Sequence, residues 1–454
     1  MNIQQQHISK LDASMIRCGV GFVFKYTFEG SVNCQKLQMS TIRVLSSIPR
    51  LQEAMKLKGQ YEGEWVTHKR STLSWFEHRV SSFETALEQC YQNLARQGNS
   101  TAAPMQLTLV NHDCKANQFA LLQSGMHSYV DGTSATAIFN LIIKHYNATL
   151  LGDVTTCQKI ESDLKKTTSP VPDEIFSLWN GKKRSLIKLS RWEHVKNLFH
   201  LLSYKINDER QYSSSFEALP KLLQNFKPET SKPKKAQFNL TEFINGSQKV
   251  LPSVSPNNMI CALIAKVMYE INLKHRKYKA PKELSFRVMV DILNAGLRKQ
   301  ILGNYIAYLP VTVDGSMPID EIATHVNKQI YTAKVTKKDI SMYKLLEFAL
   351  GSGMANKTND PVSYIISNVS NPLINFNSNL MKGACCQKFE AYSNSLPIDF
   401  KGAQLNNRPA ICFHLNANKQ LFVSFFNTLT DPNIQTQFGA TMDRVLKTSV
   451  QTFK

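Results

Sequence analysis

A basic stretch between residues 159 and 235 divides the sequence into two halves, and each half mixes strand-like and helix-like segments. In the first half, residues 18–28 alternate aromatic and aliphatic side chains, which predicts a strand. Residues 35–51 instead space their apolar side chains at roughly one helical turn, up to Pro49. Further short strands are predicted at 63–68, 107–110 and 118–124, followed by a helix whose apolar face begins at Ala135.

The second half repeats this mixture. Ser255 is a good N-cap and Pro256 suits the first helical position, so we expect a helix through residue 271. Apolar runs predict strands at 285–291, 305–313, 362–367, 410–415 and 420–426. The 454 residues therefore predict an α/β protein of two lobes with mixed β-sheets flanked by helices. We place the N-terminal lobe at 1–175, a basic helical connector and linker at 176–235, and the C-terminal lobe at 236–454.

The charge and the cysteines restrict the class of protein further. A formal net charge of +20 favours an anionic partner, which includes nucleic acid, a membrane surface, an acidic carrier protein and a phosphorylated cofactor. Nine cysteines without a CxxC pair predict neither a disulfide framework nor a metal site. The N-terminus does not have the pattern of a signal peptide, and no apolar run reaches the roughly 18 residues of a membrane span. We therefore expect a cytoplasmic protein, at most peripheral to a membrane.

The segment that carries the clearest chemical signal is His127-Ser128-Tyr129-Val130-Asp131-Gly132. A histidine takes up a proton near neutral pH, and acyl transfer to a hydroxyl needs such a general base. Asp131 either holds the histidine or braces the loop by pairing with an arginine, and Gly132 is expected to allow a sharp turn before the next helix. A structural interpretation is also open, because Asp131 is a plausible helix N-cap that needs no catalytic role.

This segment resembles the HxxxDG motif of the thioester-dependent acyltransferase superfamily. That group includes alcohol acyltransferases, wax-ester-synthase-like enzymes, polyketide-associated acyltransferases and the condensation domains of peptide synthetases. Other segments resemble the family in the same order, so that the resemblance spans most of the chain apart from roughly 152–235: residues 48–51, 254–265, 287–311 with Arg298 and Gly303-Asn304, and 364–372.

Two departures from the family are visible. Condensation domains and many wax-ester-type enzymes carry a second histidine immediately before the motif, where this chain has Met126. Asp399-Phe400-Lys401-Gly402 retains only part of the DFGWG segment of plant alcohol acyltransferases. The first departure weighs against peptide-bond formation, and together they leave the subfamily open.

The resemblance implies two chloramphenicol-acetyltransferase-like lobes with an active-site channel between them. It implies that His127 is the catalytic base and that Asp131 is structural, with Arg17 or Arg298 as its cationic partner. Candidate donors to the substrate oxyanion are Asn304, Ser367 and Asn368. No acyl-enzyme intermediate and no permanently bound cofactor are expected, and acyl-coenzyme A is the expected co-substrate.

The leading hypothesis is thus transfer of an acyl group from acyl-coenzyme A to the hydroxyl of a small molecule or lipid by a monomer. One alternative is a condensation-type N-acyltransferase that uses a carrier-bound donor. Another is a non-catalytic module that binds polyanions or membranes, although nucleic acid is not expected because no basic motif interleaved with stacking aromatics occurs. The basic, apolar-striped segment 184–205 either lies on an anionic membrane or packs its apolar face on the protein.

Overall fold

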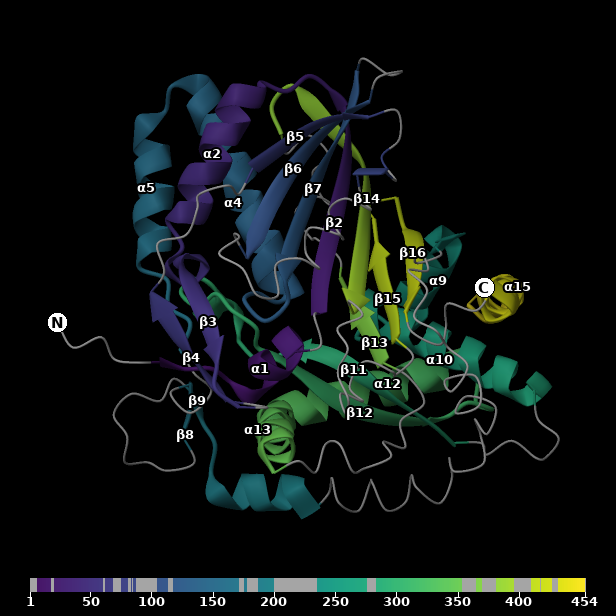
Figure 1. Ribbon diagram of the computed structural model, residues 1–454. Coiled ribbons are helices and arrows are strands. Elements are labelled where there is room, and N and C mark those ends of the chain that lie inside the picture. Colours follow the sequence, from purple (N-terminus) through teal and green to yellow (C-terminus); the bar gives the residue numbers. More distant parts are fainter. Residues whose placement is uncertain are drawn as a thin grey trace.

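The computed structural model describes residues 6–17, 20–59, 62–67, 75–80, 83, 85–86, 104–112, 117–170, 175–177, 187–199, 235–275, 283–352, 365–369, 381–395, 410–416, 418–426 and 432–453. Two mixed β-sheets with flanking helices form two lobes, as the sequence predicts (Figure 1). Each lobe has its own apolar core. The segments Pro228 to Lys234 and Asp399 to Gly402 lie outside the described residues.

The sheet of the N-terminal lobe has five strands in the order β14-β2-β7-β6-β5. All neighbouring strands are antiparallel except β5 and β6, which are parallel. Helices α2, α4 and α5 cover one face (Figure 1). The bounds are β2 Val20–Gly30, α2 Cys34–Ser46, β5 Trp75–Val80, β6 Met105–His112, β7 Gln118–Met126, α4 Gly132–Leu151, α5 Val154–Lys165 and β14 Ala384–Ser395.

The second sheet has six strands in the order β10-β16-β15-β13-β11-β12, in which β13 pairs in parallel with both β15 and β11. Asn258 N donates to Ser255 Oγ at 3.2 Å, which confirms the predicted N-cap of α10. The bounds are β10 Lys235–Asn239, α9 Thr241–Val250, α10 Pro256–His275, β11 Glu283–Asp291, α11 Ala295–Arg298, β12 Ile306–Asp314, α12 Ile319–Val335, α13 Lys338–Gly351, β13 Ile365–Asn368, β15 Ala410–Leu415, β16 Gln420–Phe426 and α15 Pro432–Thr452.

Strand β14 crosses from the second half of the chain into the sheet of the first half. It lies antiparallel beside β2 along the whole strand (Figure 1). Lys25 on β2 faces Glu390 on β14, and their buried side chains form an ion pair of 3.3 Å. Ser424 Oγ of β16 also donates to the carbonyl of Ala391, at 3.4 Å. The two lobes therefore share a strand and meet along it.

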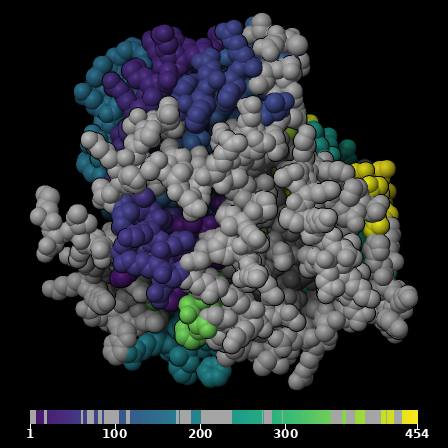
Figure 2. Space-filling view, in the orientation of Figure 1, coloured from purple at the N-terminus to yellow at the C-terminus, as the bar shows by residue number. Residues whose placement is uncertain are grey.

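The smaller strands form one sheet of three strands and one of two. Asn197 and His194 lie on a helical segment, residues 191–199, whose atoms form the lower edge of the face in Figure 2 (teal). No described helix is long and apolar enough to cross a bilayer. The remaining bounds are β1 Gln6–His7, α1 Lys10–Arg17, η1 Pro49–Gln52, β3 Glu53–Leu57, β4 Gly63–Thr67, β8 Phe176–Ser177 and β9 Ile187–Lys188.

Candidate active site

His127 is the first residue after β7, at the point where the chain leaves the N-terminal sheet. Its backbone N–H donates to the carbonyl of Val20 at 2.9 Å, which ties the start of the loop to the first residue of β2. The imidazole meets the ring of Phe22 edge-on, with 6.3 Å between the ring centroids. Strand β2 thus fixes both the backbone and one side of the ring.

The surroundings of His127 favour its neutral form. Burial lowers the pKa of the imidazole below its ordinary value, and the negative charge of Asp131 opposes this effect without cancelling it. Nδ1 is buried and has no hydrogen-bond partner among the described residues. The residue as a whole keeps partial exposure. A neutral imidazole is able to accept a proton from a hydroxyl.

Asp131 points into the protein and forms the N-cap of α4. Its side chain is fully buried and accepts the backbone N–H of Ser134 at 2.8 Å and that of Tyr305 at 3.0 Å. Arg298 Nη2 lies 2.5 Å from Asp131 Oδ2. Of the two arginines proposed from the sequence, Arg298 is thus the partner that the described residues show, while the side chain of Arg17 lies outside them. Asp131 both caps the helix and braces the loop.

Arg298 connects this cap to the other lobe. Its guanidinium also pairs with Asp291, at 2.5 Å from Nε and 2.7 Å from Nη2, and donates from Nη1 to Ser134 Oγ at 2.9 Å. Burial would lower the pKa of Arg298, but Asp131 and Asp291 outweigh burial and raise it. Sequence reasoning missed Asp291 and Ser134. The available signal was an aspartate at the end of a predicted strand, seven residues before Arg298.

The glycine that the loop geometry needs is Gly303 and not Gly132. Gly132 is the first residue of α4 and has no positive φ, and a Cβ placed there would meet only Phe24, at 3.9 Å. Gly132 therefore does not use the positive φ that glycine allows, and α4 begins at Gly132 itself. Gly303 has φ of +158°, and a Cβ there would lie 2.7 Å from the ring of Tyr305. Its carbonyl accepts the backbone N–H of Asp131 at 3.0 Å, which ties the motif to this segment.

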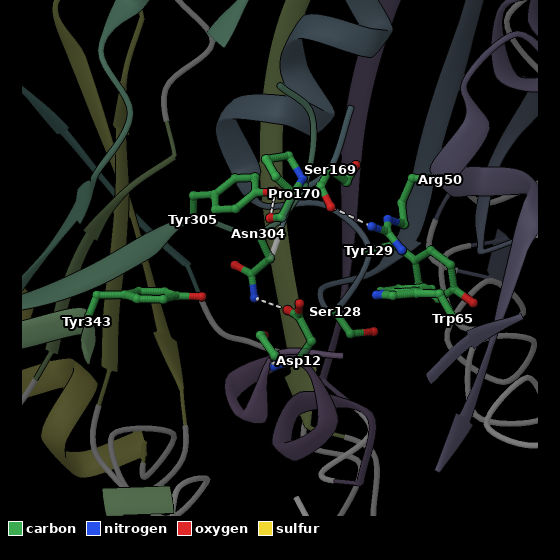
Figure 3. A pocket seen from close by; sticks show the side chains of 12 residues that line it. Asp12, Arg50, Trp65, Ser128, Tyr129, Ser169, Pro170, Asn304, Tyr305 and Tyr343 are labelled. Carbon is green, nitrogen blue, oxygen red and sulfur yellow. Dashed lines mark hydrogen bonds between the residues drawn. The ribbon is translucent and has the colours of Figure 1, made fainter. Parts of the chain in front are cut away.

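Asn304 lies in a polar pocket beside the motif (Figure 3). Its Nδ2 donates to Asp12 Oδ1 at 2.9 Å, whereas its Oδ1 is buried and without a partner among the described residues. The same holds for the hydroxyl of Ser128, which also lines the pocket. Burial raises the pKa of Asp12 to about 7. Asn304 and Ser128, the residue after His127, thus line the same pocket.

Ser367 and Asn368 lie at the end of β13, in the other lobe. Asn368 Nδ2 donates to Asn257 Oδ1 at 2.9 Å. Ser367 hydrogen-bonds the thiol of Cys412, whose pKa burial nevertheless raises to about 12. These contacts are made within the C-terminal lobe, so an oxyanion-binding role for either residue stays a prediction.

Known proteins resemble this chain in structure but do not match it in sequence. No protein-family model matches the sequence, and no curated protein matches it. Among solved structures, trichothecene 15-O-acetyltransferase from Fusarium sporotrichioides aligns with a TM-score of 0.71 at 10% identity, over 98% of this chain and 95% of that one. The condensation domain of the Monacolin K polyketide synthase aligns with a TM-score of 0.61 at 9% identity, over 98% of each chain.

A third structure is a mutant starter condensation domain of rhizomide synthetase in complex with C8-CoA. It aligns with a TM-score of 0.59 at 11% identity, over 98% of this chain and 94% of that one. All three alignments extend over both lobes and the crossing strand. The chain therefore has the two-lobed chloramphenicol-acetyltransferase-like fold that these condensation domains and this acetyltransferase share.

Proposed function

We propose that this protein is an acyltransferase that moves an acyl group from an acyl-coenzyme A thioester to a hydroxyl acceptor, with His127 as the general base. The observation that carries the proposal is the partly exposed residue His127, whose neutral form burial favours, in a loop that Asp131 and Arg298 hold from behind. The aspartate of the motif is fully engaged in structure, which leaves the histidine as the titratable group of the motif that is able to exchange a proton with a substrate.

The reaction proceeds in one ternary complex. The acceptor hydroxyl gives its proton to the imidazole of His127 while its oxygen forms a bond with the thioester carbonyl carbon. The tetrahedral oxyanion then collapses, the carbon–sulfur bond breaks, and the leaving thiolate takes the proton from the imidazolium. His127 is neutral again, and ester and free coenzyme A are the products.

The comparisons support the choice of donor and acceptor class. One neighbour is named as a 15-O-acetyltransferase, and another was solved with C8-CoA. Asn304, Ser367 and Asn368 remain candidates for binding the oxyanion, and Asn304 is the one nearest the motif in the fold because Gly303 and Tyr305 on either side of it bond Asp131.

The test is release of free thiol from a panel of acyl-coenzyme A thioesters in the presence of alcohol and amine acceptors. We expect acceptor-dependent release by the wild type and a loss of about 10²–10⁴-fold in His127→Ala, the usual contribution of a general base. His325→Ala, a change of an exposed histidine on α12, is the matched control and should keep full activity.

The pH profile gives a second readout. Because burial lowers the pKa of His127, kcat/KM should fall toward acid with a midpoint below the ordinary value of 6.5. Full activity in His127→Ala would overturn the proposal. Release only from acyl groups on a carrier protein, and only to amines, would instead favour the condensation-type reaction.

A further inference from the structure

The helical segment 191–199 packs on the protein with its polar side and turns its apolar side to solvent. Its start is fixed by a reciprocal cap in which Glu193 N donates to Ser190 Oγ at 3.1 Å and Ser190 N donates to Glu193 Oε2 at 3.0 Å. This cap fixes the rotation of the helix about its axis at the first turn. The direction in which each of the following side chains points is therefore well defined.

The inward side of this helix is held by hydrogen bonds. Asn197 is buried, and its Nδ2 donates to the carbonyl of Thr336 at 3.1 Å and to Ser341 Oγ at 3.0 Å. His194 Nδ1 lies 3.2 Å from the same Ser341 hydroxyl. Lys337 and Glu193 add an ion pair of 3.9 Å. The segment is thus docked on the turn between α12 and α13 through polar groups.

The outward side carries large apolar residues. Trp192 is 77% exposed and Phe199 69% exposed, and Val195 is exposed between them. At about 100° of rotation per residue, these three form one stripe roughly 160° away from His194 and Asn197. A helix that packs against its own protein normally buries this stripe. This helix has the sequence pattern of an amphipathic helix, but its apolar side points to solvent and its polar side points to the protein.

Basic side chains flank the stripe on both sides. Arg191 and Lys196 are exposed, and at about 100° per residue each lies roughly 70° from the centre of the stripe, on opposite sides. Nearby α12 ends with two exposed apolar residues of its own, Tyr331 and Val335. An aromatic stripe bordered by cations is the pattern of helices that lie in the plane of a membrane interface. The net charge of +20 acts in the same direction.

We propose that the outward side of helix 191–199 is a docking surface for an anionic lipid bilayer. Trp192, Val195 and Phe199 enter the headgroup region, and Arg191 and Lys196 lie against the lipid phosphates. The surface is separate from His127, so the proposal stands whether or not the acyltransferase reaction is found. If the protein both docks on the bilayer and catalyses the acyltransferase reaction, docking would bring His127 to an acceptor in the lipid phase.

The test is co-flotation of the full-length chain with vesicles of phosphatidylserine and phosphatidylcholine in equal parts, against vesicles of pure phosphatidylcholine. We expect binding to the anionic vesicles that weakens with salt. A basic residue near such a surface contributes about five-fold in binding, so Arg191→Glu with Lys196→Glu should weaken it at least about 25-fold. Trp192→Ser with Phe199→Ser should weaken it at least about ten-fold.

Leu151→Ser, which changes an exposed apolar residue at the end of α4, is the matched control and should bind like the wild type. Circular dichroism of each variant checks that the fold is retained. The proposal is overturned if the wild type stays unbound at low salt or if the Trp192/Phe199 variant floats normally. It is also overturned if sedimentation shows a dimer that this variant abolishes, because a second copy would then cover the stripe.

Discussion

Asp131 has a structural role that is separable from the proton transfer assigned to His127. Its carboxylate caps α4, accepts the backbone N–H of Tyr305 and pairs with Arg298. The residue itself never faces the pocket that Ser128 and Asn304 line. A change at Asp131 therefore acts on the position of the loop, whereas a change at His127 removes the base.

Asp131→Asn separates the charge from the cap. The amide oxygen retains the N-cap hydrogen bond, but the amide nitrogen replaces the oxygen that accepts from Tyr305 N and pairs with Arg298. Arg298 then keeps only the partly exposed carboxylate of Asp291. We expect a loss of about 1–3 kcal/mol in the free energy of unfolding, since Asp291 still pairs with the guanidinium. Urea denaturation measures it, and activity should fall together with stability. A variant as stable as the wild type would show that the ion pair with Asp131 contributes nothing.

Asp12 predicts a pH dependence of stability. Burial raises its pKa from 3.8 to about 7, so folding binds a proton that the unfolded chain has released between these values. The stability that protonated Asp12 contributes to the folded protein is present below pH 3.8 and is lost as the pH rises through about 7. The free energy of unfolding of the wild type should therefore fall relative to that of Asp12→Asn as the pH rises across this range. Parallel pH profiles for the two proteins would contradict the prediction.

At the scale of elements, strand β14 links the lobes. It supplies buried apolar residues to the core of the first lobe, among them Cys386, Phe389 and Ala391. Its charged residue Glu390 is also buried, and it pairs with Lys25 on the neighbouring strand and with Lys388 on its own strand. A strand that carries a buried charge depends on its partner strand to stay in register.

Glu390→Ala should destabilise the protein by about 3–5 kcal/mol, the usual cost of leaving one member of a buried ion pair without its partner. Thermal or urea unfolding measures this change. Lys25→Met combined with Glu390→Leu removes both buried charges and leaves only the exposed Lys388 without its partner, so it should recover most of the loss. Failure of the double variant to recover stability would mean that Glu390 acts through packing and not through the ion pair.

At the scale of the molecule, the crossing strand makes the lobes interdependent. Without β14, strand β2 would present a long unpaired edge and an incompletely covered core. A first half produced without the second would also leave the motif loop without Arg298, Gly303 and Tyr305. The lobes thus complete each other both at the sheet and at the candidate site.

Residues 1–235 produced alone should therefore fail to fold. We expect a broad unfolding transition and binding of an apolar dye, whereas mixing with residues 236–454 during refolding should restore a cooperative transition. An independently folded N-terminal fragment with protected amides in β2 would contradict this prediction. The intact chain under the same conditions is the control.

Local patterns in the sequence were enough for much of the protein. The strands predicted at 410–415 and 420–426 coincide with β15 and β16, and the Ser255 cap and Pro256 start of α10 are confirmed. These features depend on side-chain alternation and capping between residues close in sequence, which a sequence displays directly. The same is true of the HxxxDG segment, whose order within strand, loop and helix is local.

Long-range pairing was decided only by the tertiary structure. Nothing within residues 384–395 indicates that they join β2, because strand pairing depends on which surfaces meet and not on the strand alone. The same applies to Asp291 beside Arg298 and to the outward facing of Trp192. The sequence by itself determined the locally patterned elements, the motif and its histidine, but not the crossing strand β14. The packing of two distant halves determined what holds that histidine and which side of the basic helix meets the solvent.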